Sequence, residues 1–122
     1  MILLGSDTMI TSAQVNLLIG KTVEMICFAQ YSVYLHLEGR VTLTIESEFE
    51  FGLVGVERMQ QAKFPIRQSS LTRIIETLVT SAELNNSGNL RLLFSTGDSL
   101  QVFKQPEFES YRLAIGGEEF IA

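Results

Sequence analysis

Apolar and polar residues alternate along the chain with the period of a β-strand. In residues 33–37 and 41–45, Val, Leu and Ile occupy every second position, and polar residues fill the positions between them. This alternation predicts strands with one buried and one exposed face. The glycine-containing loop at residues 38–40 separates the two runs, and an apolar run precedes them. Residues 22–47 are therefore predicted to form a three-stranded antiparallel meander.

A similar pattern recurs in the second half of the chain. Residues 90–95 alternate in the same way between turn-forming segments at 85–89 and 96–98. These features predict a second three-stranded meander. Because the likeness is one of pattern rather than residue identity, residues 18–47 and 78–104 form either an internal pseudo-repeat or two sheets that arose separately.

Helical spacing of apolar residues occurs between the two meanders. Leu71, Ile74, Ile75, Leu78 and Val79 recur as one face of a helix requires. We therefore predict a helix here. Its apolar stripe is interpreted as core that lies on a sheet, with partner binding as the alternative reading.

Three further segments complete the predicted fold. A short helical turn is expected at residues 12–18, and a hairpin over residues 111–121 turns at Gly116-Gly117. Residues 52–68 mix charges, glutamines and a proline, and we interpret them as a long connection. The predicted fold class is α+β, mostly antiparallel β: two three-stranded meanders with one helix between them and a C-terminal hairpin.

Length and composition favour a single β-rich domain over residues 1–122. Apolar residues make up 46% of the chain and charged residues 19%, which is too hydrophobic for a disordered protein. No apolar run reaches the length of a membrane span, and the first residues lack the pattern of a signal peptide. We therefore expect a cytoplasmic protein.

Charge and the shortage of reactive residues narrow the function classes. Fourteen Asp and Glu residues against nine Lys and Arg residues give a net charge of −5. This sign disfavours nucleic acid and membrane surfaces as partners and suits a basic protein, although it also favours solubility. Cys27 is the one cysteine, and no nucleotide-binding or metal-ligand motif occurs. We expect no metal, no cofactor and no enzymatic activity.

Three glutamates are the main candidate for a partner-binding site. Glu46, Glu48 and Glu50 would share one face if the strand that contains residues 41–45 continued, with Phe49 and Phe51 on the other face. Such a row of carboxylates can guard a sheet edge against aggregation. It can also dock Lys or Arg side chains of a basic partner, or hold a divalent cation weakly.

Tyr34 and His36 are candidate aromatic anchors for the same partner. They share the polar face of the predicted strand 33–37 with Glu38. A Tyr-His-Glu row suggests acid–base chemistry, and a hydrolase that uses His36 and Glu38 is a third reading that requires an enclosed cleft. The simpler interpretation is an ordinary solvent-facing side of a strand, so no catalytic residue is assigned.

The tail of the chain resembles the closing motif of a family of small bacterial proteins of unknown function. The residues concerned are Pro-Glu-Phe-Glu-Ser-Tyr-Arg-Leu at 106–113, followed by Gly116-Gly117. Residues 18–23, Leu-Ile-Gly-Lys-Thr-Val, resemble the opening of that family. The resemblance implies no activity. Small acidic bacterial proteins of this kind include immunity proteins that neutralise toxins, and the analogy is one of size and charge.

These observations lead to two hypotheses of different classes. The first is a non-enzymatic protein-binding module, specifically an immunity protein that covers a basic toxin nuclease, with Glu46, Glu48, Glu50, Tyr34 and His36 as the binding residues. The second is a homo-oligomeric structural or small-ligand-binding domain, a possible homodimer, in which apolar residues such as Leu93 and Phe51 are buried between subunits or around a pocket.

Overall fold

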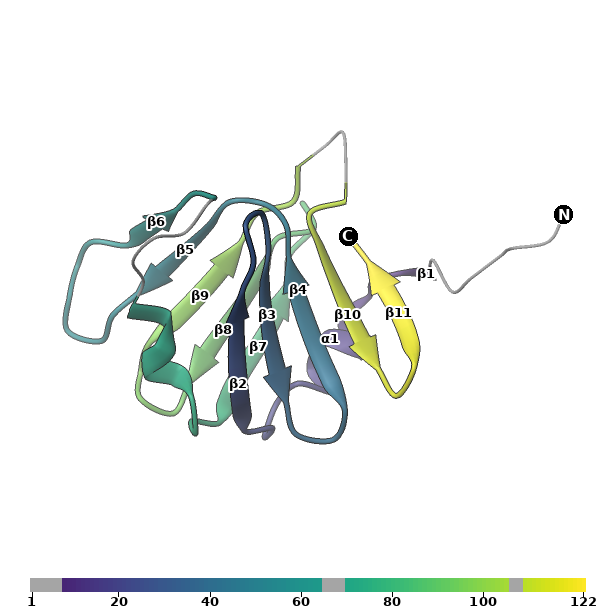
Figure 1. The fold of residues 1–122 in the computed structure, drawn as a ribbon, viewed down its shortest axis with the longest axis horizontal. Coiled ribbons are helices and arrows are strands. Elements are labelled where there is room, and N and C mark those ends of the chain that lie inside the picture. The colour runs from purple at the N-terminus through teal and green to yellow at the C-terminus, as the bar shows by residue number, and fades with distance from the viewer. Residues whose placement is uncertain (1–7, 65–69, 106–108) are drawn as a thin grey trace, which may run out of the picture.

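A computed structural model describes residues 8–64, 70–105 and 109–122, and it shows two β-sheets (Figure 1). The first sheet, sheet A, has six strands in the spatial order β1-β11-β10-β4-β3-β2. Neighbouring strands are antiparallel except for the parallel pair β1 and β11. In chain order these strands are β1 (Thr8–Met9), β2 (Val23–Phe28), β3 (Val33–Leu37), β4 (Val41–Ile45), β10 (Tyr111–Ile115) and β11 (Glu118–Ile121).

The second sheet, sheet C, has five antiparallel strands in the order β6-β5-β9-β8-β7. A short α-helix, α1 (Ser12–Asn16), lies against strand β7. A 3₁₀ helix, η1 (Ser70–Ile74), comes just before β7 in the chain. The strands are β5 (Phe49–Gly52), β6 (Gln60–Ala62), β7 (Val79–Leu84), β8 (Leu90–Phe94) and β9 (Ser99–Val102). The protein is therefore mostly antiparallel β, as the sequence predicts.

The two predicted meanders lie in different sheets. Strands β2, β3 and β4 belong to sheet A, and β7, β8 and β9 belong to sheet C. Neither meander stands alone, because β10 of the C-terminal hairpin pairs with β4, and β5 pairs with β9. Each meander thus forms one side of a larger sheet, with β2 and β7 as edge strands, and the two sheets meet face to face.

The interpretation of residues 52–68 as a long connection is wrong for its first part. Strand β6 folds back on β5, with Phe49 opposite Ala62 and Phe51 opposite Gln60. Of the original segment, residues 65–68 lie outside the described part of the chain. The glutamines are consistent with a strand at the edge of a sheet, where one face meets water.

The helix predicted from Leu71 to Val79 is shorter than expected and of a different type. The chain forms one 3₁₀ segment, Ser70–Ile74, and Val79 already begins β7 opposite Phe94. Glu76 between them has a φ of 73°, which ends any helix. The β-branched residues of this stretch favour strands over helices, and pairing with β8 decides the outcome.

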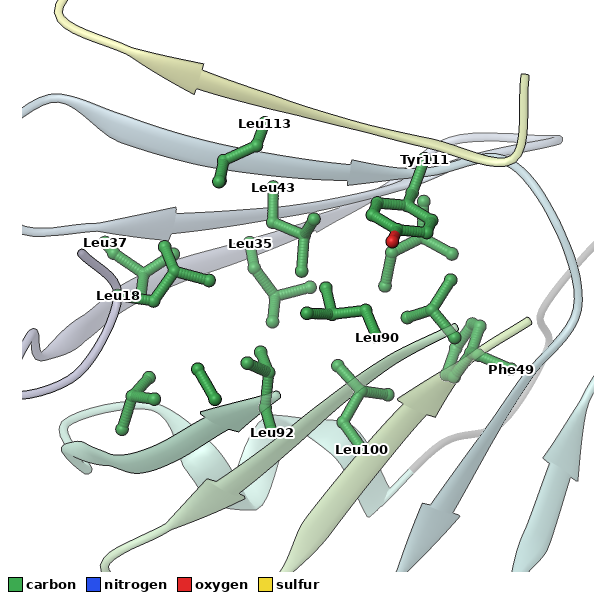
Figure 2. Packing of buried hydrophobic residues seen from close by; sticks show 14 of the residues in the cluster. Leu18, Leu35, Leu37, Leu43, Phe49, Leu90, Leu92, Leu100, Tyr111 and Leu113 are labelled. Atoms are coloured by element: carbon green, nitrogen blue, oxygen red, sulfur yellow. The ribbon is translucent and has the colours of Figure 1, made fainter. Parts of the chain in front are cut away.

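The core lies between the two sheets and is formed by the side chains that point inward from their strands (Figure 2). Leu35, Leu43 and Leu113 approach from sheet A, while Leu92 and Leu100 approach from sheet C, and all five are fully buried. Figure 2 shows these side chains meeting in the space between the layers. Phe51 is also in this core, 2% exposed, so the expectation that it lies at a subunit interface or pocket is wrong.

Candidate functional site

The outer face of sheet A carries Tyr34 and His36. Both lie on β3, a strand paired on both sides, and both are half-buried because Val33, Leu35 and Leu37 take the inward positions. The register places Tyr34 between Cys27 and Thr44. Glu38 lies beyond the end of the strand at Leu37, and its carboxylate accepts a hydrogen bond from the Thr22 N–H at 2.8 Å.

The His36 ring is held by its neighbour on β4. Nδ1 of His36 lies 3.1 Å from Oγ1 of Thr42, within hydrogen-bond distance. On β2, the other strand beside β3, Met25 lies opposite His36 and is 49% exposed. The result is an open row of Met25, His36 and Thr42 across three strands, in which imidazole and thioether groups face outward.

Glu46 lies beyond the end of β4 on the same outer face. Its N–H donates to the Ser110 carbonyl at 2.8 Å, and its Oε1 lies 3.0 Å from Nε of Arg112. Because Arg112 is opposite Thr44, and Thr44 is opposite Tyr34, the ion pair lies close to the tyrosine across two strand pairings. Both side chains of the pair are about one-third exposed, 36% for Arg112 and 37% for Glu46.

The chain crosses from sheet A to sheet C between Glu46 and Glu48. Ser47 turns inward, and its hydroxyl donates to the Phe103 carbonyl at 2.8 Å. Glu48 is exposed, and together with Glu46, Ser47, Phe64 and Gln105 it lines a surface hollow of about 370 Å³. The hollow is where the two sheets join.

Glu50 lies on the outer face of the other sheet. It is on β5, opposite Gln101 and Gln61, and Nε2 of Gln61 donates to Oε1 of Glu50 at 3.3 Å. Since β4 ends at Ile45 and β5 begins at Phe49, the expectation that three glutamates line one continuous strand is wrong. The structure brings Tyr34, His36 and Glu46 to one face, places Glu48 at the joint, and separates Glu50 from them.

Sequence reasoning missed a buried carboxylate. Asp98, in the turn between β8 and β9, is 0% exposed. It accepts hydrogen bonds from the Val54 N–H at 2.8 Å, from the Thr96 hydroxyl at 2.9 Å and from Nε of Arg73 at 3.1 Å. Burial raises the pKa of Asp98, but the hydrogen bonds and the Arg73 charge outweigh it, and the net pKa lies below its usual value.

The Asp98 cluster ties η1 and the β5–β6 connection to the β8–β9 turn. The Thr-Gly-Asp sequence at 96–98 is visible as a turn, but nothing local connects it with Val54 or Arg73, which are 44 and 25 residues away. With every carboxylate oxygen engaged and the side chain buried, the cluster is a structural joint. It is therefore not assigned to the candidate binding site.

In residues 8–64, 70–105 and 109–122, no group of three or more His, Cys, Asp or Glu side chains is placed to hold a metal ion. Within the same part of the chain, no helix is long and apolar enough to cross a membrane.

Comparison with protein families gives one match. A model described as "Family of unknown function (DUF6188)" matches residues 14–122. The chain belongs to this family. The match to DUF6188 begins inside α1 and includes every strand except β1, so the family spans both sheets. It also contains the tail motif, of which Pro106, Glu107 and Phe108 lie outside the described residues. No curated protein and no solved structure shows significant similarity to the chain.

Proposed function

We propose that this DUF6188 protein is a non-enzymatic protein-binding module, specifically an immunity protein that neutralises a basic toxin nuclease. The observation that carries the proposal is the outer face of sheet A, where Tyr34 and His36 stand half-exposed on a rigid strand next to Glu46. We call Tyr34, His36, Glu46 and Glu48 the acidic-aromatic patch. Large aromatic groups flanked by charge are typical of protein-binding surfaces.

Tyr34 and His36 suit the role of anchors because their side chains have little conformational freedom left to lose when a partner binds. Their strand is paired on both sides, and the His36 ring is held by Thr42. A side chain that is already ordered loses less conformational entropy when a partner covers it. The patch therefore offers contact area on a backbone that needs no rearrangement.

The two glutamates of the patch suit a cationic partner. Glu46 is fixed by its contact with Arg112, while Glu48 is exposed, and no cation pairs with it within the described residues. With a net charge of −5, the chain as a whole attracts a basic partner, and these carboxylates supply local attraction at the patch. Such complementarity chiefly raises the association rate and the selectivity of binding.

The test begins with identification of the partner. Tagged protein is used to capture binding proteins from the native bacterium at low and at high salt, and the gene next to its own is inspected for a large toxin. The basic protein recovered is then titrated calorimetrically with wild type and with the double variant Glu46→Lys, Glu48→Lys. Glu50→Lys, on the opposite face, is the matched control, and circular dichroism checks that each variant is folded.

We expect the double variant to bind at least about tenfold more weakly and Glu50→Lys to bind like wild type, because only the first reverses charge inside the patch. We also expect wild type to block nucleic-acid cleavage by the captured nuclease at a concentration at which the double variant does not. Recovery of no basic partner, or equal affinity of all three proteins, would overturn the assignment.

A second candidate function rests on the outer face of sheet C. A hollow of about 290 Å³ there is lined by Glu83, Leu84, Asn85, Asn89, Arg91 and Gln101. Amide, carboxylate and guanidinium groups of this kind suit a small polar ligand, and Leu93 lies half-buried on the same face. Arg91→Ala would abolish binding of such a ligand and leave toxin binding unchanged, which separates the two hypotheses.

A further inference from the structure

Strand β2 ends sheet A, and most of its outer side has no strand beside it. At its first residue, the Val23 N–H donates to Thr77 at 2.9 Å, and the Val23 carbonyl accepts from Glu76 at 2.7 Å. Beyond Val23 no such bond to the outer side occurs within the described residues. The Ala29 N–H bonds to Ser32 of the β3 side at 2.9 Å. Hydrogen-bonded positions alternate along an antiparallel pair, so the backbone groups of Ile26 and Phe28 point away from the sheet.

The other sheet edges are protected, whereas this one is not. Strand β1 has two residues, β6 has three and is flanked by Arg58 and Lys63, and β7 lies against α1. The sequence from Met25 to Leu35 contains no Asp, Glu, Lys or Arg, and it contains no proline. Short length, charge, proline and cover are the usual guards of an edge strand. From Met25 to Phe28, β2 has none of them; Glu24 and the bulge beside it lie at the end of the strand that already bonds to residues 76 and 77.

We propose that two copies of this chain pair through β2, antiparallel and about a two-fold axis, so that sheet A continues from one copy into the other. The two outward-pointing residues fix the register: Ile26 lies opposite Phe28 of the second copy, and Cys27 lies opposite Cys27. This pairing forms about four hydrogen bonds between the copies, two for each Ile26–Phe28 pair. This dimer is a property beyond the proposed function, and it leaves the acidic-aromatic patch open to a partner.

A second copy of the chain is the occupant that this uncharged, apolar edge favours. Two chains of net charge −5 repel each other over most of their surfaces, and this edge is a place where neither carries charge. The register also places Met25, 49% exposed, opposite Ala29, and Phe28, 41% exposed, opposite Ile26. Apolar side chains that are exposed to water in a single chain thus lie opposite apolar side chains in the dimer.

Cys27 supplies a test without any mutation. In the proposed register the two Cys27 residues form a non-hydrogen-bonded pair with Cα atoms roughly 4.5 Å apart, within the range that a disulfide spans. Diamide, which oxidises two thiols to a disulfide and takes up their hydrogen atoms, is expected to link wild type into a covalent dimer. Without oxidant, light scattering is expected to give twice the mass of the chain, with dissociation on dilution.

The matched control moves the thiol by two residues on the same exposed side of the strand. In the double variant Met25→Cys, Cys27→Ser, each new cysteine lies opposite residue 29, so the two thiols are separated by about four residues of strand, roughly 13 Å. We expect this variant to keep the dimer mass and to lose the disulfide. Equal cross-linking of both proteins would overturn the register.

A second variant tests the edge itself. Phe28→Pro removes an N–H that points away from β3 and is therefore expected to leave sheet A intact while it removes two of the hydrogen bonds between the copies. We expect a monomer with the circular dichroism spectrum of wild type. If wild type is a monomer at every concentration, the proposal is wrong, whether or not the toxin-binding experiment succeeds.

Discussion

At the scale of single residues, two buried polar groups connect parts of the chain that are distant in sequence. The Asp98 carboxylate accepts hydrogen bonds from three donors, and the Tyr111 hydroxyl donates to the Gly88 carbonyl at 2.7 Å. Both side chains are 0% exposed. A buried polar group that loses its partner is costly, so both residues are expected to matter for stability.

Asp98→Asn is expected to lower the free energy of unfolding by about 2 kcal/mol, because the amide brings an NH₂ group to a site surrounded by donors and leaves one of them unsatisfied. Urea denaturation at neutral pH measures the change. Glu57→Gln, an exposed acidic residue in the β5–β6 connection, is the control and should change stability by less than about 0.5 kcal/mol. Equal effects would remove the structural role assigned to Asp98.

The same site predicts a pH dependence. Since the folded pKa of Asp98 is below the ordinary value of 3.8, the unfolded chain takes up the proton first as the pH falls. The stabilisation is therefore complete well above pH 3.8 and disappears as the pH falls through the folded pKa. Urea denaturation at pH 7, 5 and 3 should show the difference between wild type and Asp98→Asn shrinking only at the lowest value. A constant difference would contradict this assignment.

Tyr111→Phe tests the second joint. The hydroxyl links β10 of sheet A to the turn before β8 of sheet C. Burial raises the pKa of Tyr111 above its ordinary value of 10.0, so the hydroxyl remains a donor even at a pH where an exposed tyrosine ionises. Its loss is expected to cost about 1 to 2 kcal/mol in urea denaturation. Tyr31→Phe, at a residue that is 64% exposed, should have almost no effect. Similar losses for both would show that the Gly88 contact contributes nothing.

At the scale of elements, hairpins behave as the sequence predicts and the helix does not. A hairpin is decided by a turn and by alternation in neighbouring residues, both of which are local. The stretch from Leu71 to Val79 satisfies helical spacing, yet Val79 gains a strand partner in β8. Pairing with β8, the next strand along the chain, outweighs a weak local preference for helix.

The turn between β3 and β4 contains a backbone strain that a substitution can relieve. Gly39 has a φ of 80°, and Arg40 follows with a φ of 62°, a conformation that favours Gly or Asn over Arg. Arg40→Asn is expected to raise the midpoint of thermal unfolding and to add about 0.5 kcal/mol of stability. Arg58→Asn, at a position without positive φ, should give no such gain. A lower midpoint for Arg40→Asn would show that Arg40 makes a compensating contact.

At the scale of the whole molecule, stability depends on the contact between the two sheets. Leu92 of β8 is fully buried between them, and its loss leaves a cavity that neither rigid sheet can close. Leu92→Ala is expected to cost about 3 kcal/mol in urea denaturation, whereas Leu17→Ala, 54% exposed, should cost less than about 1 kcal/mol. A small loss for Leu92→Ala would mean that the core collapses around the gap.

The candidate site illustrates how far sequence reasoning reaches. Tyr34 and His36 are on the outer face of β3, as alternation within one strand predicts. Alternation also predicts correctly that Glu46 and Glu48 are exposed while Phe49 is buried. What alternation misses is the crossing at Ser47, where the chain leaves one sheet for the other and carries Glu50 to the opposite side of the molecule.

The sequence by itself determines the mostly antiparallel β class, the strands of both meanders, the C-terminal hairpin and the inward residue at most strand positions. Each of these depends on side-chain alternation and turn residues within about ten neighbouring positions. The tertiary structure alone decides which sheet each strand joins, where β4 gives way to β5, that the helix ends at Ile74 and a strand begins at Val79, and that Asp98 meets Val54 and Arg73. These outcomes depend on pairing and burial between residues far apart in the chain. Such contacts contribute to stability only once the two sheets have come together.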